Sequence, residues 1–186
     1  DGILWKIDSK TGNFIQLLET VNQNIYDKID YKTGKLSYRD DILNSKVDKA
    51  FSVCPGIYGG HNWQAISYDE TTSSLIIPLH QLCADMIGRK VERVEGYGGF
   101  GADSKSYPLP DANGKIGKLI SVNIDKMKIN WTHEQEAMFL TSSLSTAGGL
   151  TFIGDLDRYF KAFNSKTGEL LWKTRLGSAL HGFPIT

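Results

Sequence analysis

Few residues in this 186-residue sequence belong to the types that usually mark a site or a cellular compartment. The chain has two cysteines, three methionines and five prolines. Neither sign of charge is in excess, because Lys and Arg together number 21 and Asp and Glu together also number 21. The composition therefore indicates no general attraction to nucleic acid or to an anionic lipid surface. No run of apolar residues is long enough to span a membrane as a helix.

Several familiar catalytic and metal-binding patterns are also missing. The sequence contains neither Gly-x-Ser-x-Gly nor His-Glu-x-x-His. Its histidines stand singly, and we expect each to be an ordinary surface or loop histidine: His61, His80, His133 and His181. The glycine-rich stretch 96–101 has no apolar strand before it and no helix after it, so we expect a flexible loop rather than a phosphate-binding one. These residues name neither a complete catalytic set nor a metal site.

Two further groups of residues, the acidic stretch 155–158 and the two cysteines, each lead to a specific expectation. Asp155-Leu-Asp157-Arg158 lacks the remaining ligand spacing of a calcium loop, so we expect Asp157 and Arg158 to form a salt bridge of their own at a turn. Cys54 and Cys83 have no Cys-x-x-Cys spacing, which disfavours a structural zinc site. They are either buried free thiols of a cytosolic protein or a bridge across about thirty residues, which would contribute roughly 3–4 kcal/mol.

What the sequence has in quantity is glycine, at 19 residues, and aromatic residues spread along the whole chain. This composition favours turns and strands over helices. Residues 2–15 alternate apolar and polar positions on both sides of a Ser-Lys-Thr-Gly turn, which predicts a β-hairpin with Gly12 at a positive φ. The same turn recurs within residues 158–172, and a degenerate copy occupies residues 119–131.

The last two hairpins are related by a fixed offset. Aligning Trp131 with Trp172 places Ser121 opposite Ala162, at an offset of 41 residues. That period is typical of the blades of a β-propeller, which run to roughly 40–50 residues. A further Lys-Thr-Gly at 32–34 lacks flanking alternation, so we interpret it as a chance recurrence.

The remaining segments predict long connections between blades. Residues 19–48 are polar and read as a first surface excursion, and residues 89–110 read as a second. Between them, residues 54–60 predict a turn-rich loop and residues 75–79 a strand. The hexapeptide Gly59-Gly-His-Asn-Trp-Gln64 joins that loop to the strand. Its glycines permit a close backbone approach, and its Asn62 and Trp63 are suited to gripping a flat polar ligand at its edge.

Taken together, these segments resemble one known family. Residues 162–172 are similar to the tryptophan-docking repeat of the dehydrogenases that depend on pyrroloquinoline quinone (PQQ), which are eight-bladed quinoprotein propellers. The hexapeptide resembles the segment that places an Asn-Trp pair at the cofactor in that family. Residues 148–157 and 176–184 resemble late-blade segments. The resemblance implies an all-β fold, a partial β-propeller of about three blades with long inter-blade loops, in which residues 1–186 form a single domain whose ends are both internal to a longer chain.

The resemblance also implies site residues. Asn62 would hydrogen-bond the quinone, Trp63 would lie at the cofactor's edge, and Leu180 would make a backbone contact to PQQ. Cys54 and Cys83 match a disulfide of alcohol-oxidising members, which implies a periplasmic protein. The family's ligands for Ca²⁺ or a lanthanide, and its catalytic aspartate, would lie upstream of this sequence.

The implied activity is the oxidation of an alcohol or sugar, with hydride transfer to PQQ and electrons passed to a cytochrome c or a membrane quinone. The alternative is a non-catalytic propeller with the same repeats that acts as a periplasmic assembly or binding scaffold, because a fold does not fix a function.

Overall fold

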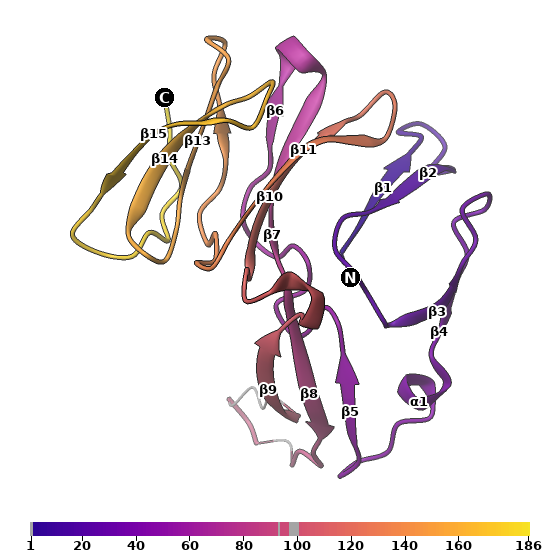
Figure 1. The fold of residues 1–186 in the computed structure, drawn as a ribbon. Helices are drawn as coiled ribbons and strands as arrows, with labels where there is room; N and C mark the ends of the chain where they lie inside the picture. The colour runs from indigo at the N-terminus through magenta and orange to yellow at the C-terminus, as the bar shows by residue number, and fades with distance from the viewer. Residues whose placement is uncertain (1, 93, 97–100) are drawn as a thin grey trace.

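Strands form almost all the regular structure of the chain in a computed structural model that describes residues 2–92, 94–96 and 101–186 (Figure 1). Within these ranges the helical elements are a four-residue helix, α1 (Asp40–Leu43), and two 3-10 turns at Glu70–Thr72 and Pro110–Ala112. No helix among the described residues is long and apolar enough to cross a membrane.

Two four-stranded antiparallel sheets form complete blades. The first has the order β6-β7-β10-β11, and the second has the order β12-β13-β14-β15. Their bounds are β6 Ser67–Asp69, β7 Ser74–His80, β10 Gly117–Asn123 and β11 Lys128–Gln135, then β12 Leu144–Ser145, β13 Leu150–Gly154, β14 Tyr159–Asn164 and β15 Leu170–Arg175. The two sheets lie side by side. Ser143, which precedes β12, accepts hydrogen bonds at its Oγ from the backbone N–H and the hydroxyl of Ser67, at the start of β6.

A third unit is the hairpin of β1 (Ile3–Ile7) and β2 (Phe14–Glu19), which packs on the other face of the first blade. Gly12 has the expected positive φ, of 73°. The two blades and this hairpin do not close into a ring (Figure 1). The predicted partial propeller is thus confirmed, as two full blades and a two-stranded part of a third.

The core accounts for the burial of the two central strands of the first blade, β7 and β10. Alternate side chains of β7 and β10 enter two separate clusters, so that Leu119 faces one and Ile120 the other. The cluster toward the second blade contains Ile76, Leu119, Trp131, Phe139, Ile153 and Phe163. The cluster toward the β1–β2 hairpin contains Val21, Ile77, Leu79, Ile120 and Val122. Because both faces are covered, β7 and β10 are buried along most of their length, and residues 75–79 of β7 form a continuous apolar run.

The predicted alignment of the repeats is confirmed strand by strand. Trp131 pairs with Ser121 and Trp172 pairs with Ala162, and in each hairpin the register shifts immediately after that pair. The indole of Trp131 lies on the turn of the next blade, where its Nε1 donates to Ser165 O at 2.8 Å. A Cβ added at Gly168 would lie 2.6 Å from the indole ring, so only glycine admits this contact.

The prediction for Lys-Thr-Gly at 32–34 was wrong. This tripeptide turns a hairpin of β3 (Tyr26–Ile29) and β4 (Leu36–Tyr38). Gly34 has a φ of 73°, and a Cβ there would meet the Phe14 ring at 2.6 Å, as a Cβ at Gly168 would meet Trp131. The hairpin is short and largely exposed, so no buried face imposes alternation on its sequence.

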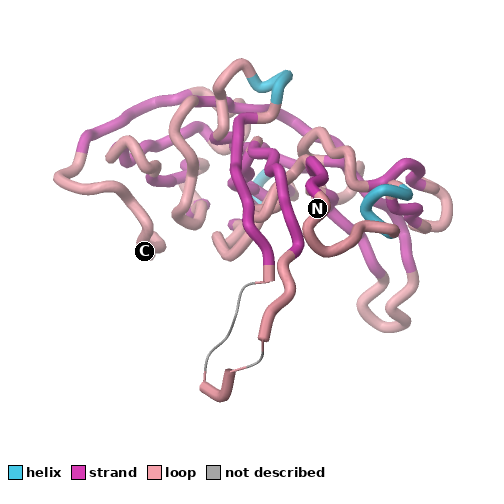
Figure 2. The backbone as a smooth tube through the Cα atoms, turned by 90° about the horizontal axis from the view of Figure 1, so that it is seen from below, coloured by secondary structure: helices cyan, strands magenta, loops and turns pink. Residues whose placement is uncertain are grey.

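The second excursion also contains structure that the sequence did not indicate. β9 (Ala102–Pro108) lies within 89–110, where we expected a loop, and it forms a three-stranded sheet with β5 (Ala50–Val53) and β8 (Leu82–Gly88). The polar β9 is mostly exposed, which removes the apolar signal. Figure 2 shows the β8–β9 hairpin projecting away from the blades. Within the glycine-rich stretch 96–101, residues 97–100 lie outside the described residues.

Candidate functional site

The loop that carries Asn62 and Trp63 is fixed at both ends. At its start, Cys54 forms a disulfide with Cys83 of β8, which confirms the predicted bridge and settles the choice between bridge and free thiols. Gly56 N donates to Leu82 O at 2.7 Å beside that bridge. Just before the pair, Gly60 O accepts from His80 N at 2.7 Å, and just after it Gln64 Nε2 lies 3.2 Å from His80 Nε2. Asn62 and Trp63 therefore lie between two residues that are both held to His80.

The two glycines of the hexapeptide act as expected. Gly59 adopts a positive φ of 65°, which an L side chain rarely does. A Cβ on Gly60 would lie 2.7 Å from Gly2 Cα and 2.7 Å from a methyl group of Val21. The loop therefore packs its backbone directly against the start of the β1–β2 hairpin.

Gln64 and His80 form the buried base of the loop. Gln64 is 2% exposed and His80 is 0% exposed. Their Nε2 atoms lie 3.2 Å apart, and His80 Nε2 is also 3.1 Å from Phe139 O. The expectation that His80 is an ordinary surface or loop histidine was therefore wrong, because it is buried at the end of β7. Its two polar partners lie 16 and 59 residues away in sequence, so no local pattern could have indicated them.

The environment of His80 disfavours its charged form. Burial lowers the pKa of the imidazole, the nearby His61 lowers it further, and the hydrogen bond to Phe139 O opposes this effect in part. No described residue hydrogen-bonds the buried Nδ1. Burial likewise lowers the pKa of His133, whose ring packs against Phe163 with centroids 4.8 Å apart.

Acidification is expected to destabilise the protein through His80. Because the folded-state pKa is depressed, the unfolded chain binds the proton first as the pH falls through about 6.5. The stabilising effect of neutral His80 is complete above that pH and is lost below it. Denaturant midpoints measured from pH 7.5 to 5 should fall less steeply in His80→Gln than in wild type. An exposed-site control, His181→Gln, should retain the wild-type slope, and equal slopes in all three proteins would contradict this role for His80.

Asn62 and Trp63 are presented outward from this base. Both are exposed, and Trp63 is 54% exposed. The backbone N–H of Asn62 faces Gln64 Oε1 at 3.4 Å, while its side-chain amide has no hydrogen-bond partner among the described residues. An unpaired amide next to an exposed indole, on a constrained loop, fits the edge of a flat ligand that carries carbonyl and carboxylate oxygens. PQQ has that chemistry.

Leu180 lies in a different part of the chain. Its N–H donates to Asp155 O at 3.2 Å, and a Cβ on Gly154 would meet its side chain at 2.8 Å. It lines an apolar cavity of about 300 Å³, which neither Asn62 nor Trp63 lines, together with Thr141, Phe160, Leu176, Gly182, Phe183 and Pro184. The structure thus places Asn62 and Trp63 on one loop, and Leu180 lines a cavity that neither of them lines.

The acidic turn beside Leu180 is paired differently from our expectation. Asp157 lies 3.5 Å from Arg175 rather than bonding Arg158. The buried Asp155 instead pairs with Lys161 at 2.6 Å and accepts from Gln135 at 3.1 Å. The sequence prediction was wrong because Arg158 occupies a turn with a φ of 71°, and the partner of Asp157 is on β15. No group of three or more His, Cys, Asp or Glu among the described residues is arranged to hold a metal ion.

Comparisons with known proteins agree with this fold. The family described as "Glucose/ethanol/alcohol dehydrogenase, beta-propeller domain" matches residues 110–186. Over the whole chain, the sequence is 30% identical to "Methanol dehydrogenase [cytochrome c] subunit 1" of Methylobacterium organophilum, and 28% identical to "Quinoprotein ethanol dehydrogenase" of Pseudomonas aeruginosa. The chain spans 30% and 31% of these two relatives, which is about a third of their length.

A solved structure extends the similarity to three dimensions. The structure titled "Europium-containing methanol dehydrogenase" superposes with a TM-score of 0.90 at 26% identity. The match covers 99% of this chain and 32% of that one. The similarity therefore includes the long excursions as well as the blades.

Proposed function

We propose that the chain, which belongs with the quinoprotein dehydrogenase propellers, is one segment of an enzyme that oxidises a small alcohol with PQQ as cofactor. An alcohol is favoured over a sugar because the two relatives described above are named for methanol and ethanol. PQQ, when bound, supplies the acceptor for the substrate's hydride. The observation that carries the proposal is the exposed Asn62–Trp63 pair between Gly60 and Gln64, which are both held to His80.

The residues of this chain have binding and orienting roles in the proposal. The Asn62 amide provides hydrogen bonds to polar edge groups of the cofactor, and the Trp63 indole covers its edge and excludes water. Buried Gln64 and His80 hold the loop that presents this pair. Leu180, held by Asp155 and Gly154, is proposed to offer a backbone contact to the same cofactor. The general base and the metal ligands are assigned to parts of the protein outside this chain.

The metal ion, the electron acceptor and the cellular location are proposed from the names of similar proteins and from the disulfide. A calcium or lanthanide ion is proposed as the second cofactor, since the structural neighbour contains europium. A cytochrome c is proposed as electron acceptor in preference to a membrane quinone, since a relative carries cytochrome c in its name. A periplasmic location is proposed from the disulfide, because structural disulfides persist in oxidising compartments.

Reconstitution of the full-length protein tests this function. The protein is loaded with PQQ in the presence of calcium or of a lanthanide, and dye reduction is followed with primary alcohols and with sugars. We expect retained quinone absorbance and alcohol-dependent dye reduction with at least one of the two metals. Failure to retain PQQ with either metal would leave a scaffold, the non-catalytic use of the same fold, as the better description.

A further inference from the structure

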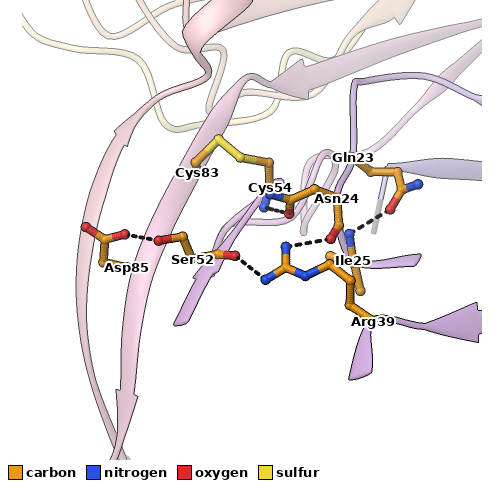
Figure 3. The surroundings of a disulfide bond; sticks show 8 residues. All are labelled: Gln23, Asn24, Ile25, Arg39, Ser52, Cys54, Cys83 and Asp85. Atoms are coloured by element: carbon orange, nitrogen blue, oxygen red, sulfur yellow. Dashed lines mark hydrogen bonds between the residues drawn. A yellow bond between two sulfur atoms is a disulfide. The ribbon is translucent and has the colours of Figure 1, made fainter. Parts of the chain in front are cut away.

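The first excursion, residues 19–48, bonds directly to the cysteine that begins the Asn62–Trp63 loop. Asn24 N donates to Cys54 O at 2.8 Å, and Cys54 N donates to Asn24 Oδ1 at 2.7 Å. Both polar backbone groups of Cys54, a residue 8% exposed, are therefore satisfied by a single residue of the excursion. Figure 3 shows this pair beside the disulfide.

Asn24 is in turn held by Arg39. The guanidinium donates to Asn24 O at 2.8 Å and to Ser52 O at 3.0 Å, so it bridges the excursion and β5 (Figure 3). Asp41 pairs with the same guanidinium at 2.6 Å and raises its pKa, which keeps the charge in place. A planar guanidinium can reach both carbonyls at once, whereas a lysine ammonium cannot present the same fork.

Cys54 is thus restrained from two directions. On one side, β8 holds it through the disulfide to Cys83, and Ser52 Oγ hydrogen-bonds Asp85. On the other side, the excursion holds it through Asn24 and Arg39. The loop leaves this point with Gly59 N donating to Gly56 O at 2.8 Å. A displacement of Cys54 would therefore be passed on to the residues before Asn62.

We propose that Asn24 and Arg39 are positioning residues for the cofactor loop, and that the first excursion serves as its second anchor beside the disulfide. The cofactor part of this inference rests on the proposed function. If the excursion were only a surface insertion, removing its bonds to Cys54 would loosen residues 19–48 and leave residues 54–64 unchanged.

Substitutions at Asn24 separate these two cases. Asn24→Ala removes the acceptor of Cys54 N, whereas Asn24→Asp keeps an acceptor oxygen at that position. Asn44→Ala is a matched control, because Asn44 bonds Asp40 O within the same excursion and does not contact Cys54. In full-length protein we expect Asn24→Ala to weaken PQQ binding about fivefold. Asn24→Asp and Asn44→Ala should bind PQQ as wild type does.

A second readout does not depend on PQQ. Amide hydrogen exchange over residues 54–64, measured on the protein without cofactor, should be faster in Asn24→Ala and in Arg39→Lys, and restored in Asn24→Asp. Arg39→Lys retains the charge and provides a second test should Asn24→Ala fold poorly. Exchange over residues 54–64 that matches wild type in both variants would overturn the proposal. If wild type binds no PQQ, the proposed function fails, and the exchange data still decide whether the excursion positions this loop.

Discussion

Replacing Trp131 by alanine is expected to lower the free energy of unfolding by about 3–5 kcal/mol, the cost of truncating a large aromatic residue in a core. The indole is 8% exposed and joins the cluster between the two blades. Its Nε1 donates to Ser165 O at 2.8 Å, and its ring lies on Gly168 of the next blade. The substitution therefore opens a cavity at the contact between the blades and leaves a buried carbonyl without its donor.

Trp63→Ala is the matched control for this substitution. Trp63 is 54% exposed, so truncating it should change stability by no more than about 0.5 kcal/mol, as at most surface sites. Chemical denaturation of both variants of the full-length protein provides the measurement. Equal losses of stability in the two variants would contradict the assignment of Trp131 to the blade contact and of Trp63 to the ligand surface.

Replacing both Cys54 and Cys83 by serine is the second substitution with a large expected effect. The bridge closes a loop with a sequence separation of 29, for which chain entropy gives about 3–4 kcal/mol. Both cysteines belong to a buried cluster with Leu109 and Ala112, where two hydroxyl groups would add a desolvation cost. We expect the urea midpoint to fall accordingly and the Asn62–Trp63 loop to exchange its amides faster.

A reductant is the control for this second prediction. In wild type it should reproduce most of the loss of stability, and in the double serine variant it should have no effect. A double variant as stable as oxidised wild type would show that the bonds of Cys54 to Asn24 suffice without the bridge.

The sequence predicted well those segments whose buried side chains give the sequence a recognisable apolar pattern. The hairpins at 2–15, 119–131 and 158–172 each contribute side chains to a buried cluster, such as Leu4, Leu119 and Phe163. Their turns carry a further local signal, since Asn164 Oδ1 accepts from Lys166 N and Thr167 N, and Gly168 follows at a positive φ. A contact confined to a few neighbouring residues can be inferred from sequence alone.

The parts that sequence missed are stabilised by distant partners. β3, β4 and β9 are short or exposed, so their pairing leaves little apolar pattern. His80 is buried by Phe139 and Gln64, which reach it only in the folded chain. Asn24 and Arg39 appear in the sequence as ordinary polar residues of a surface segment. Their role depends on contacts to residues 13 to 30 positions away, which no periodicity encodes.

The candidate site was likewise predictable from sequence only in part. The hexapeptide and the disulfide could be assigned by resemblance to a family, and the structure adds the exposed amide of Asn62 and its buried support. Leu180 was assigned in the same way, and it lies on a separate cavity. Its proposed contact with the cofactor remains a prediction.

In the proposed function, Asn62 and Trp63 form one wall of a PQQ site. The most direct test of this claim is an equilibrium titration of PQQ into the full-length protein and its Asn62→Ala variant, with calcium or a lanthanide present and with stability measured in parallel. We predict saturable binding to wild type and binding about tenfold weaker to the variant at unchanged stability, as expected for the loss of a hydrogen bond to a charged or strongly polar group. Equal PQQ affinity in the two proteins would contradict the claim.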